Sequence, residues 1–545
     1  MLKDTKESNI IRILMLIYMV PLGLVLAFNT LISMLQTTYS ELYQQAEIPL
    51  YKKDHPILLL LIGVAFFVGL FLLGRFLDKK KAEEYEKLLR IKYIAECLSI
   101  LFAALVSLSC VFLFKCILAC DSMLISDAAK EFLAGDYSSL TGDGYLSHYP
   151  FQLGFVGYIQ LFYIIFGYDC YRVLQIVNAI MIVLTVFLFH RITDTIFNDP
   201  VYSIVFSICS VALLPYYMYA IFVYGDVPGI FLGVAGIYFA IKYMATSTSK
   251  SLNGKSICMV LGATLSMTLA MILKGNSAIF LVAIVIALVI FAFSKHDWRP
   301  LIFIGILLVG CIGLSKLVYL GYSVKTGMEI PDGVPKTAWV AMGLQSDEEI
   351  GFGAYNGYNW NVYTENGYDS ELASQVAIDS IKESLRSYIA SPKEGVRFFY
   401  YKFIAMWNMP DYNALLDNEW YSRHVEGHSP LAVSLIYGTG RILLGIMTNV
   451  LQFLVLLGAT ILVVSNVLSL GRKRRYDINA DISSRMELGY LGTMPVLLTV
   501  LGGYIFHIFW EAQSRYALPY YVLCVIVAAW GWISLVKHLS GTQEV

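Results

Sequence analysis

The chain has 545 residues, of which 58% are hydrophobic and only 14% are charged, and its formal net charge at pH 7 is −1. Its mean hydropathy of +0.65 is far above the range of a soluble domain of this size. Because the net charge is near zero and Lys and Arg fall between apolar runs, no nucleic-acid-binding surface is expected. The composition indicates a polytopic membrane protein.

Apolar runs of about 20 residues mark the segments that are able to cross the hydrocarbon core of a bilayer. They predict about twelve spans, and the expected fold class is therefore an all-α polytopic membrane protein. The first run is too long for the core of a signal peptide, so we expect it to remain as a helix. The runs lie at 10–34, 56–77, 93–118, 172–190, 201–220, 227–245, 256–273, 278–294, 300–321, 446–469, 487–507 and 517–536.

These runs divide the chain into four parts. Residues 1–92 form a two-helix N-terminal extension that ends in a basic loop, and 93–321 form a transmembrane module with a polar outer loop at 119–171. Residues 322–445 are long enough for a small external cap, and 446–545 hold the last transmembrane helices. The apolar segment 151–167 is interpreted as an interfacial helix, because an extra span there would move the basic loops outside.

Basic residues set the orientation in the membrane. One cluster lies between the second and third runs, and another follows the tenth run at 472–475. Loops rich in Lys and Arg stay in the cytoplasm, so both termini are predicted to be cytoplasmic, and 119–171 and 322–445 to be outside. The first cluster contains Lys79, Lys80, Lys81, Lys87, Arg90 and Lys92.

Seven of the nine cysteines lie within or beside apolar runs, and no pair has CxxC spacing. Such cysteines behave as small buried hydrophobic residues. Neither a disulfide framework nor a cysteine metal site is expected.

Charged groups at the external membrane face are the candidates for function, because a charge at that depth is costly without a partner or a task. Asp121 follows the third run, and Asp127 comes six residues later. If 122–134 is helical, both carboxylates lie at the mouth of the bundle, where they could act as general acid or base. A capping or solvated acid is the alternative, above all for Asp127.

A second group of candidates opens the interfacial segment and the next external turn. His148, Tyr149 and Gln152 belong to the stretch HYPFQ, in which the proline suits a first helical turn. His148 could face a phosphate or the lipid headgroups. Asp226 in YGDVP could line a cavity or cap the helix that follows it.

The remaining candidates are cations at the outer ends of later spans. Lys274 precedes a Gly-Asn turn and could clamp a phosphate, although snorkelling towards the headgroups is the alternative. Arg515 is suited to bidentate binding of a phosphate or carboxylate, and Tyr516 follows it. An ion pair with Glu511, four residues earlier, is the alternative for Arg515.

The order and spacing of spans over residues 93–320 resemble the GT-C superfamily of polyprenyl-phosphate-sugar glycosyltransferases. The similarity is to the branch that holds the protein O-mannosyltransferases and the lipid A aminoarabinose transferase. The family's Asp-Glu pair reads Asp121-Ser122 here, and its Lys-Pro-Pro or His-Pro-Pro reads His148-Tyr149-Pro150. The resemblance rests on the acid-bearing outer loop, the YPFQLG stretch at 149–154, Phe166-Gly167, the turns with Asp226 and Lys274, and Arg515-Tyr516.

This resemblance implies a GT-C-like bundle whose site lies on the extracytoplasmic face of the cell membrane. The sugar would pass from a polyprenyl-phosphate-linked donor to an acceptor such as a cell-surface glycan, a teichoic acid or a protein. Asp121, with Asp127, would be catalytic; Lys274, Arg515 and His148 would bind the donor phosphate. Asp226, Tyr149, Gln152, Glu511 and Tyr516 would line the cavity.

Alternatives from other classes stay open. A flippase or transporter for lipid-linked sugars would use the same charges along a pathway, and an O-antigen-type polymerase or ligase would handle the same carrier. No cofactor is expected. A divalent ion held by Asp121, Asp127 and Asp226 is chemically feasible but is not the favoured interpretation.

Overall fold

The computed structural model describes residues 2–43, 46–246, 254–347, 350–471 and 480–541. Within these ranges twelve helical segments are long and apolar enough to cross a membrane, and each coincides with one of the predicted runs. The all-α polytopic fold class is therefore confirmed. The twelve segments are α1 (Leu2–Leu35), α2 (Pro56–Glu83), α3 (Tyr85–Leu113), α7 (Tyr171–Phe197), a broken span Pro200–Ile221, α10 (Asp226–Thr246), α11 (Gly254–Leu273), Gly275–Lys295, α13 (Arg299–Thr326), α20 (Thr439–Gly471), α21 (Ala480–Phe506) and Ser514–Ser540.

Three of these spans contain short 3-10 turns. The broken span consists of α8 (Pro200–Cys209), η3 (Ser210–Leu213), α9 (Leu214–Met218) and η4 (Tyr219–Ile221). Two other spans begin with a 3-10 turn: η5 (Gly275–Ser277) leads into α12 (Ala278–Lys295), and η6 (Ser514–Ala517) leads into α22 (Leu518–Ser540).

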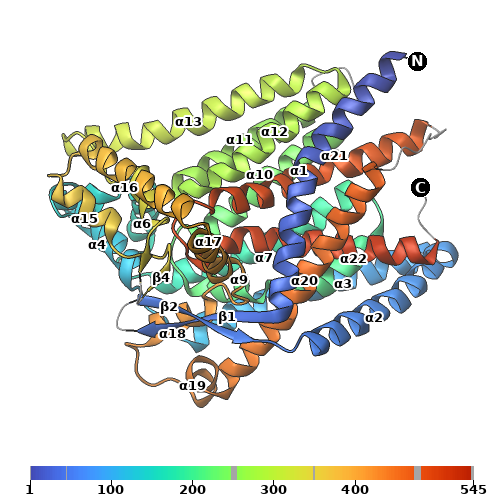
Figure 1. Ribbon diagram of the computed structural model, residues 1–545, viewed down its shortest axis with the longest axis horizontal. Coiled ribbons are helices and arrows are strands. Elements are labelled where there is room, and N and C mark those ends of the chain that lie inside the picture. The colour runs from blue at the N-terminus through green and yellow to red at the C-terminus, as the bar shows by residue number, and fades with distance from the viewer. Residues whose placement is uncertain (1, 44–45, 247–253, 348–349, 472–479, 542–545) are drawn as a thin grey trace.

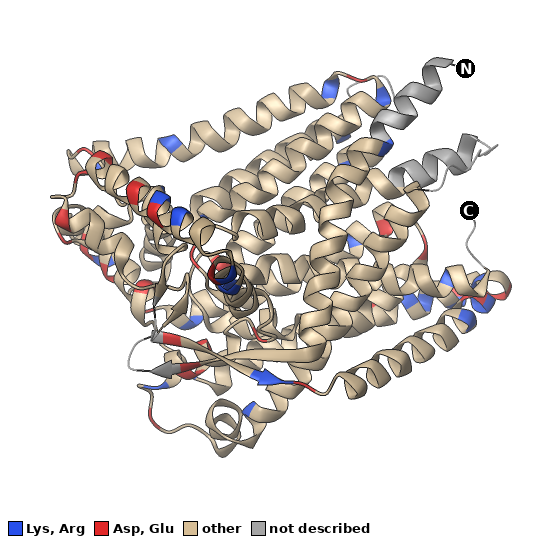
Figure 2. Cartoon of the chain, viewed as in Figure 1, with Lys and Arg blue, Asp and Glu red and all other residues tan. Residues whose placement is uncertain are grey.

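The long helices run side by side across the molecule, and the connecting segments gather at its two ends (Figure 1). The start of α1 and the end of α22 lie at the same end, and the large segment after α13 lies at the opposite end. Charged residues concentrate at both ends, whereas the middle of the bundle is almost free of them (Figure 2). This is the charge distribution that a bilayer selects. The second predicted basic cluster, 472–475, lies outside the described residues.

The first two helices are packed into the bundle. Helix α1 packs against α20, and α2 packs against α22. Helices α20 and α22 cross closely, because a Cβ atom on Gly531 would lie 2.0 Å from the carbonyl oxygen of Gly458. Small residues at such crossings allow helix backbones to approach in a lipid environment.

The outer loop between α3 and α7 forms a chain of short helices. The predicted helix at 122–134 is present as α4 (Cys120–Ala134), and Pro150 starts a short 3-10 turn as expected. The segment Pro150–Phe166 bends by 95° from Ser138–His148, and it is not one of the twelve spans. The other elements are η1 (Ser138–Leu140), α5 (Tyr145–His148), η2 (Pro150–Gln152) and α6 (Leu153–Phe166).

The cap between α13 and α20 is mostly helical and has a small hydrophobic cluster of its own around Trp339 and Tyr363. Aromatic contacts attach it to the membrane module: Trp360 stacks on His148 at 3.4 Å between ring centroids, and Trp339 stacks on Trp510 at 5.8 Å. Its elements are α14 (Lys336–Met342), β3 (Ser346–Asp347), β4 (Gly351–Phe352), α15 (Tyr358–Glu365), α16 (Ser370–Ala390), α17 (Pro392–Trp407), α18 (Ala414–Ser422) and α19 (Pro430–Tyr437).

Two antiparallel hairpins were not expected from the sequence. The larger joins the first two spans and pairs β1 (Gln36–Tyr43) with β2 (Ala46–Lys53), with Gln36 opposite Lys53. The smaller is formed by β3 and β4 inside the cap. The larger hairpin lies on the cap side of the molecule, beside α18 (Figure 1).

Candidate functional site

Close backbone contacts bring three distant turns together at the cap end of the bundle. A Cβ atom on Gly225 would lie 2.3 Å from the carbonyl oxygen of Leu273, and one on Gly154 would lie 2.1 Å from that of Ile272. Only glycine allows such approaches, since any side chain would collide with the backbone. The turn before α10 and the start of α6 therefore meet the end of α11, beside Lys274.

Lys274 and Arg515 share the same aromatic surroundings. The Lys274 ammonium donates a hydrogen bond to Asp226 at 3.1 Å and lies 4.6 Å from the centre of the Tyr224 ring. The Arg515 guanidinium lies 5.7 Å from the same ring and 4.8 Å from that of Phe222. Both cations also face the ring of Tyr516, at 5.7 Å each. Aromatic faces attract cations, so these rings hold the two positive charges near each other.

Asp121 lies next to this pair of cations. Its carboxylate accepts hydrogen bonds from Tyr145 and Tyr224, and Arg515 and Lys274 act on it electrostatically. Solvent reaches the side chain, but the concave surroundings remove much of its hydration, and this desolvation raises the pKa of Asp121 above its ordinary value despite the two cations. A carboxylate with a raised pKa is a stronger base than a fully solvated one.

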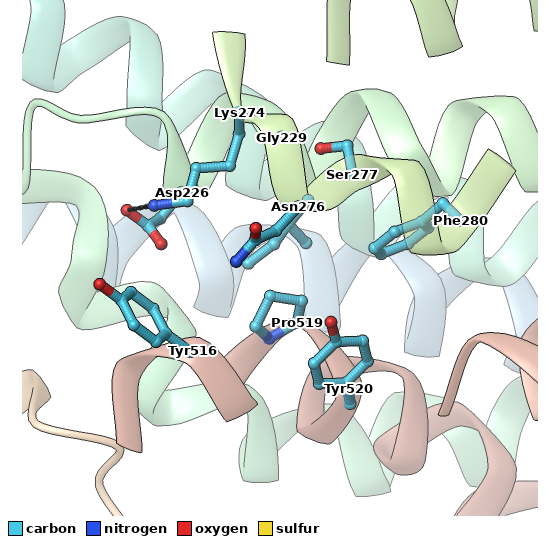
Figure 3. A pocket seen from close by; sticks show the side chains of 10 residues that line it. Asp226, Gly229, Lys274, Asn276, Ser277, Phe280, Tyr516, Pro519 and Tyr520 are labelled. Atoms are coloured by element: carbon cyan, nitrogen blue, oxygen red, sulfur yellow. Dashed lines mark hydrogen bonds and ion pairs between the residues drawn. The ribbon is translucent and has the colours of Figure 1, made fainter. Parts of the chain in front are cut away.

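A small crevice, with a cavity volume of about 20 Å³, lies beside Lys274 (Figure 3). Asp226, Lys274 and Tyr516 lie towards one end of it, and Phe280 lies at the other. The lining comes from the first turns of α10, of η5 and α12, and of η6 and α22. Helix N-termini carry partial positive charge and unpaired N–H groups, so three of them at one crevice favour an anion.

Three more carboxylates interact with Arg515, and of these only Glu511 is predicted from the sequence. Glu511 is 5% exposed, and burial raises its pKa to about 7 although Arg515 opposes the shift. Burial also raises the pKa values of Glu47 and Asp417. Among the described contacts, no ion pair joins Arg515 to Glu511: Arg515 donates to Gln513, and Glu511 accepts from Tyr516. Residues 511–513 are not helical, so the i,i+4 geometry is absent.

The predicted site residues divide into two groups. Asp121, Gln152, Asp226, Lys274, Glu511, Arg515 and Tyr516 come together, with Gln152 donating a hydrogen bond to the Tyr224 hydroxyl and Tyr516 donating one to Glu511. Asp127 lies on another face of α4, where its carboxylate is half exposed and 3.6 Å from the Lys130 ammonium.

His148 and Tyr149 lie at the boundary with the cap. The two ring nitrogens of His148 are within 3.1 Å of the Gly144 carbonyl and the Thr364 hydroxyl, so both already have partners. None of its described contacts is with Lys274 or Arg515. Tyr149 accepts a hydrogen bond from Asn359 at 3.4 Å. It also interacts electrostatically with Asp121 and Glu511.

Several residues at the site are not predicted from the sequence. Tyr224 contacts Gln152, Lys274 and Arg515, yet the sequence pattern around Asp226 gives a tyrosine at this position no functional role. Gly225, the next residue, is the available signal, because its backbone closely approaches Leu273. Glu47 and Asp417 give no signal in the sequence, because each resembles any other acid between the apolar runs until the fold places it near Arg515. In the described ranges, no group of three or more His, Cys, Asp or Glu side chains is arranged to hold a metal ion.

No protein-family model matches the sequence, and no curated protein matches it either. Among solved structures, the chain is similar to the archaeal oligosaccharyltransferase AglB from Archaeoglobus fulgidus, in complex with an inhibitory peptide and a dolichol-phosphate. The TM-score is 0.41 and the identity 13%, over 82% of this chain and 51% of AglB. The chain thus spans about half of that protein's length. A similarity of this strength does not by itself establish a shared fold or activity, so the functional conclusion rests on the geometry of the site.

Proposed function

We propose that the protein is a GT-C-type membrane glycosyltransferase that moves a sugar from a polyprenyl-phosphate carrier to an acceptor outside the cytoplasm. The observation that carries this proposal is the crevice that has Lys274 near its polar end, an apolar far end and three helix N-termini around it. A lipid-linked phosphate is an anion attached to an apolar chain, and this crevice matches both parts.

Lys274 and Arg515 are the residues that we assign to the donor phosphate. When the carbon–oxygen bond to the sugar breaks, its electron pair passes to the phosphate oxygen, and negative charge grows there. Cations held in place beforehand stabilise that charge without having to reorganise. Asp226 keeps Lys274 in position through its hydrogen bond before the donor arrives.

Asp121 is the residue that we assign as the base. As the acceptor hydroxyl attacks the anomeric carbon, its proton passes to the Asp121 carboxylate while the phosphate leaves. The raised pKa of Asp121 supports this role, and so does its position beside both cations. No nucleotide is needed, since the phosphate of the carrier is itself the leaving group.

The acceptor side is assigned to the boundary between the outer loop and the cap, and we propose a cell-surface glycan as the acceptor. Tyr149 hydrogen-bonds to Tyr355, and both rings sense the charges of Asp121 and Glu511. Trp339 lies 5.9 Å from Tyr149 between ring centroids. Rigid aromatic rings with polar edges beside the proposed base suit a ring-shaped polar substrate.

The test is transfer of a radiolabelled sugar from polyprenyl-phosphate donors in proteoliposomes. Lys274→Ala alone would strand the buried Asp226, so the informative variant is the double change Lys274→Met with Asp226→Asn. We expect kcat/KM for the donor to fall by about 10²-fold or more, as for the loss of other charge-stabilising groups. Lys325→Met, at the exposed outer end of α13, is the matched control.

If the double variant transferred sugar at the wild-type rate, the roles assigned to Lys274 and Asp226 would be wrong. If the wild type transferred no sugar but moved the labelled lipid across the bilayer, the flippase alternative would replace this proposal.

A further inference from the structure

The hairpin between the first two spans is fixed to the segment that leads into the site. The amide of Thr38 donates to the Asn408 carbonyl at 3.1 Å, and the Asn408 side chain donates to the Gln36 carbonyl at 2.7 Å. On the second strand, Tyr51 packs on Tyr401, with ring centroids 5.3 Å apart. These contacts hold the hairpin against α17 and the residues that follow it.

One side chain of the hairpin enters the charged cluster. Glu47, near the start of β2, accepts a hydrogen bond from the Asn413 side chain at 2.5 Å. Its other carboxylate oxygen accepts one from Nε2 of Gln513 at 3.2 Å. The Oε1 atom of Gln513 in turn accepts a hydrogen bond from Arg515 at 3.2 Å. A continuous chain of hydrogen bonds therefore joins the hairpin to Arg515.

The charge of Glu47 determines which way the Gln513 amide faces. A carboxylate only accepts hydrogen bonds and a guanidinium only donates them. The amide satisfies both when its NH₂ group faces Glu47 and its oxygen faces Arg515. Turned over, it would set oxygen against carboxylate and NH₂ against guanidinium, and both contacts would be repulsive. Glu47 thus selects one orientation of the amide.

Several carboxylates, Asp226 and Asp417 above all, act on Arg515 through their charge, but none of them makes a described hydrogen bond or ion pair with it. Its described hydrogen bond is the one to Gln513, its Nε atom is buried without a partner, and the rest of the guanidinium faces aromatic rings. Ring faces attract a cation but fix its rotation less strictly than a directed hydrogen bond does. The Gln513 oxygen is consequently the main directional contact of this side chain.

We propose that the hairpin is part of the donor site and that Glu47 is a positioning residue, which holds the Gln513 amide so that its oxygen orients Arg515. This inference rests on the proposed function, because it takes Arg515 to be a ligand of the donor phosphate. The inference also implies a role for the first two helices: α1 and α2 anchor the two ends of the hairpin.

The test compares binding of a long-chain polyprenyl phosphate with that of the matching polyprenol, which lacks the phosphate, to the full-length protein in nanodiscs. In Glu47→Gln the new amide allows Gln513 to turn over, so we expect phosphate-lipid affinity to fall about tenfold, equivalent to about 1.4 kcal/mol. Polyprenol binding should not change. Glu41→Gln, an exposed acid on the opposite strand, is the matched control.

A second variant separates orientation from general damage to the fold. The exchange Glu47→Gln with Gln513→Glu conserves the net charge and restores one favourable arrangement: the new amide donates to the new carboxylate, which accepts from Arg515. We expect it to recover most of the lost affinity. Failure of the exchange to recover affinity, in protein with a wild-type unfolding temperature, would count against the positioning role.

The outcomes also separate this inference from the proposed function. If Glu47→Gln bound the polyprenyl phosphate with wild-type affinity while Arg515→Ala bound it more weakly, only the positioning role of Glu47 would be overturned. Unchanged binding in Arg515→Ala would instead overturn the assignment of Arg515 to the donor phosphate, and this inference would fall with it.

Discussion

Tyr224 is the residue at which the elements of the site meet. Its hydroxyl donates to Asp121 and accepts from Gln152, while its ring faces both Lys274 and Arg515. A phenol can do all of this at once, because its edge and hydroxyl are polar while its face attracts cations. The proposed base, Asp121, and the two cations proposed for the donor phosphate are thereby held at one fixed separation, which is what positioning of two reactants requires.

The hydrogen bond from Tyr224 has a consequence for the pH dependence of the reaction. It stabilises the charged form of Asp121 and so lowers the pKa of that carboxyl, against the larger effect of burial. Tyr224→Phe keeps the ring and removes the hydroxyl, so the pKa of Asp121 should rise further. A base works only when deprotonated, and the acidic limb of kcat/KM should therefore move to higher pH.

The measurement is a pH–rate profile of sugar transfer for the wild type and Tyr224→Phe. Asp121→Asn serves as the reference, and its transfer rate should fall by about 10²–10⁴-fold because the base is missing. An acidic limb that stays in place in Tyr224→Phe, or moves to lower pH, would show that Asp121 does not set it.

At the scale of elements, the spans were predictable because a bilayer demands about twenty apolar residues for each helix, and that demand is written locally in the sequence. The start of α4 and the proline turn before α6 were predictable for similar local reasons. The β1–β2 hairpin was not: its sequence is short and mixed, and its stability comes from Asn408 and Tyr401, several hundred residues away. Glu47 meets Gln513 across 466 positions of the chain, which no local pattern encodes.

Helix α17 connects the cap to the site through a buried lysine. The Lys402 ammonium donates to the Gly343 carbonyl, and Gly353 packs beside the same side chain with a positive φ of 70°. The Gly353 carbonyl accepts from the amide of Ala512 at 2.7 Å, next to Glu511. Lys402 is 3% exposed, and burial lowers its pKa to about 7. The charged form is therefore costly in the folded cap.

This lysine should make stability depend on pH. Between about pH 7 and the unfolded value near 10.4, the unfolded chain holds a proton on Lys402 that the folded protein does not, so stability rises with pH. The gain is up to about 1.4 kcal/mol per pH unit within that window. The variant Lys402→Met lacks the titrating group, so its stability should not show this gain. In thermal unfolding from pH 7 to 9.5, the wild type should gain stability relative to Lys402→Met as pH rises.

Lys382→Met, on the exposed face of α16, is the control and should follow the wild-type curve. Parallel curves for the wild type and Lys402→Met would mean that Lys402 keeps its charge in the folded protein.

At the scale of the whole molecule, the end opposite the cap is held together by a compact ionic network. Arg191 donates to Glu96 at 2.5 Å, and Lys92 donates to Asp194 at 2.7 Å and lies 3.3 Å from Glu96. The charges of these four groups balance, and the network joins α3 to α7. The cap end is different in kind, since carboxylates there outnumber Lys274 and Arg515. The balanced network has the character of a structural element, whereas buried acids with raised pKa values, as at the cap end, are typical of functional sites and agree with the proposed function.

Because the two ends of the bundle differ in this way, the proposed function depends on which end faces the cytoplasm. The basic loop after α2 is predicted to be cytoplasmic, and α1 begins and α22 ends at that same end of the bundle. The cap and the crevice would then face outside, where a nucleotide sugar is absent and a lipid-linked donor is required. An epitope tag at Ser391, the exposed junction of α16 and α17, should bind antibody on intact cells. A tag after Val545 should bind only after permeabilisation, whereas a reversed pattern would place the site in the cytoplasm and remove the reason for a lipid carrier.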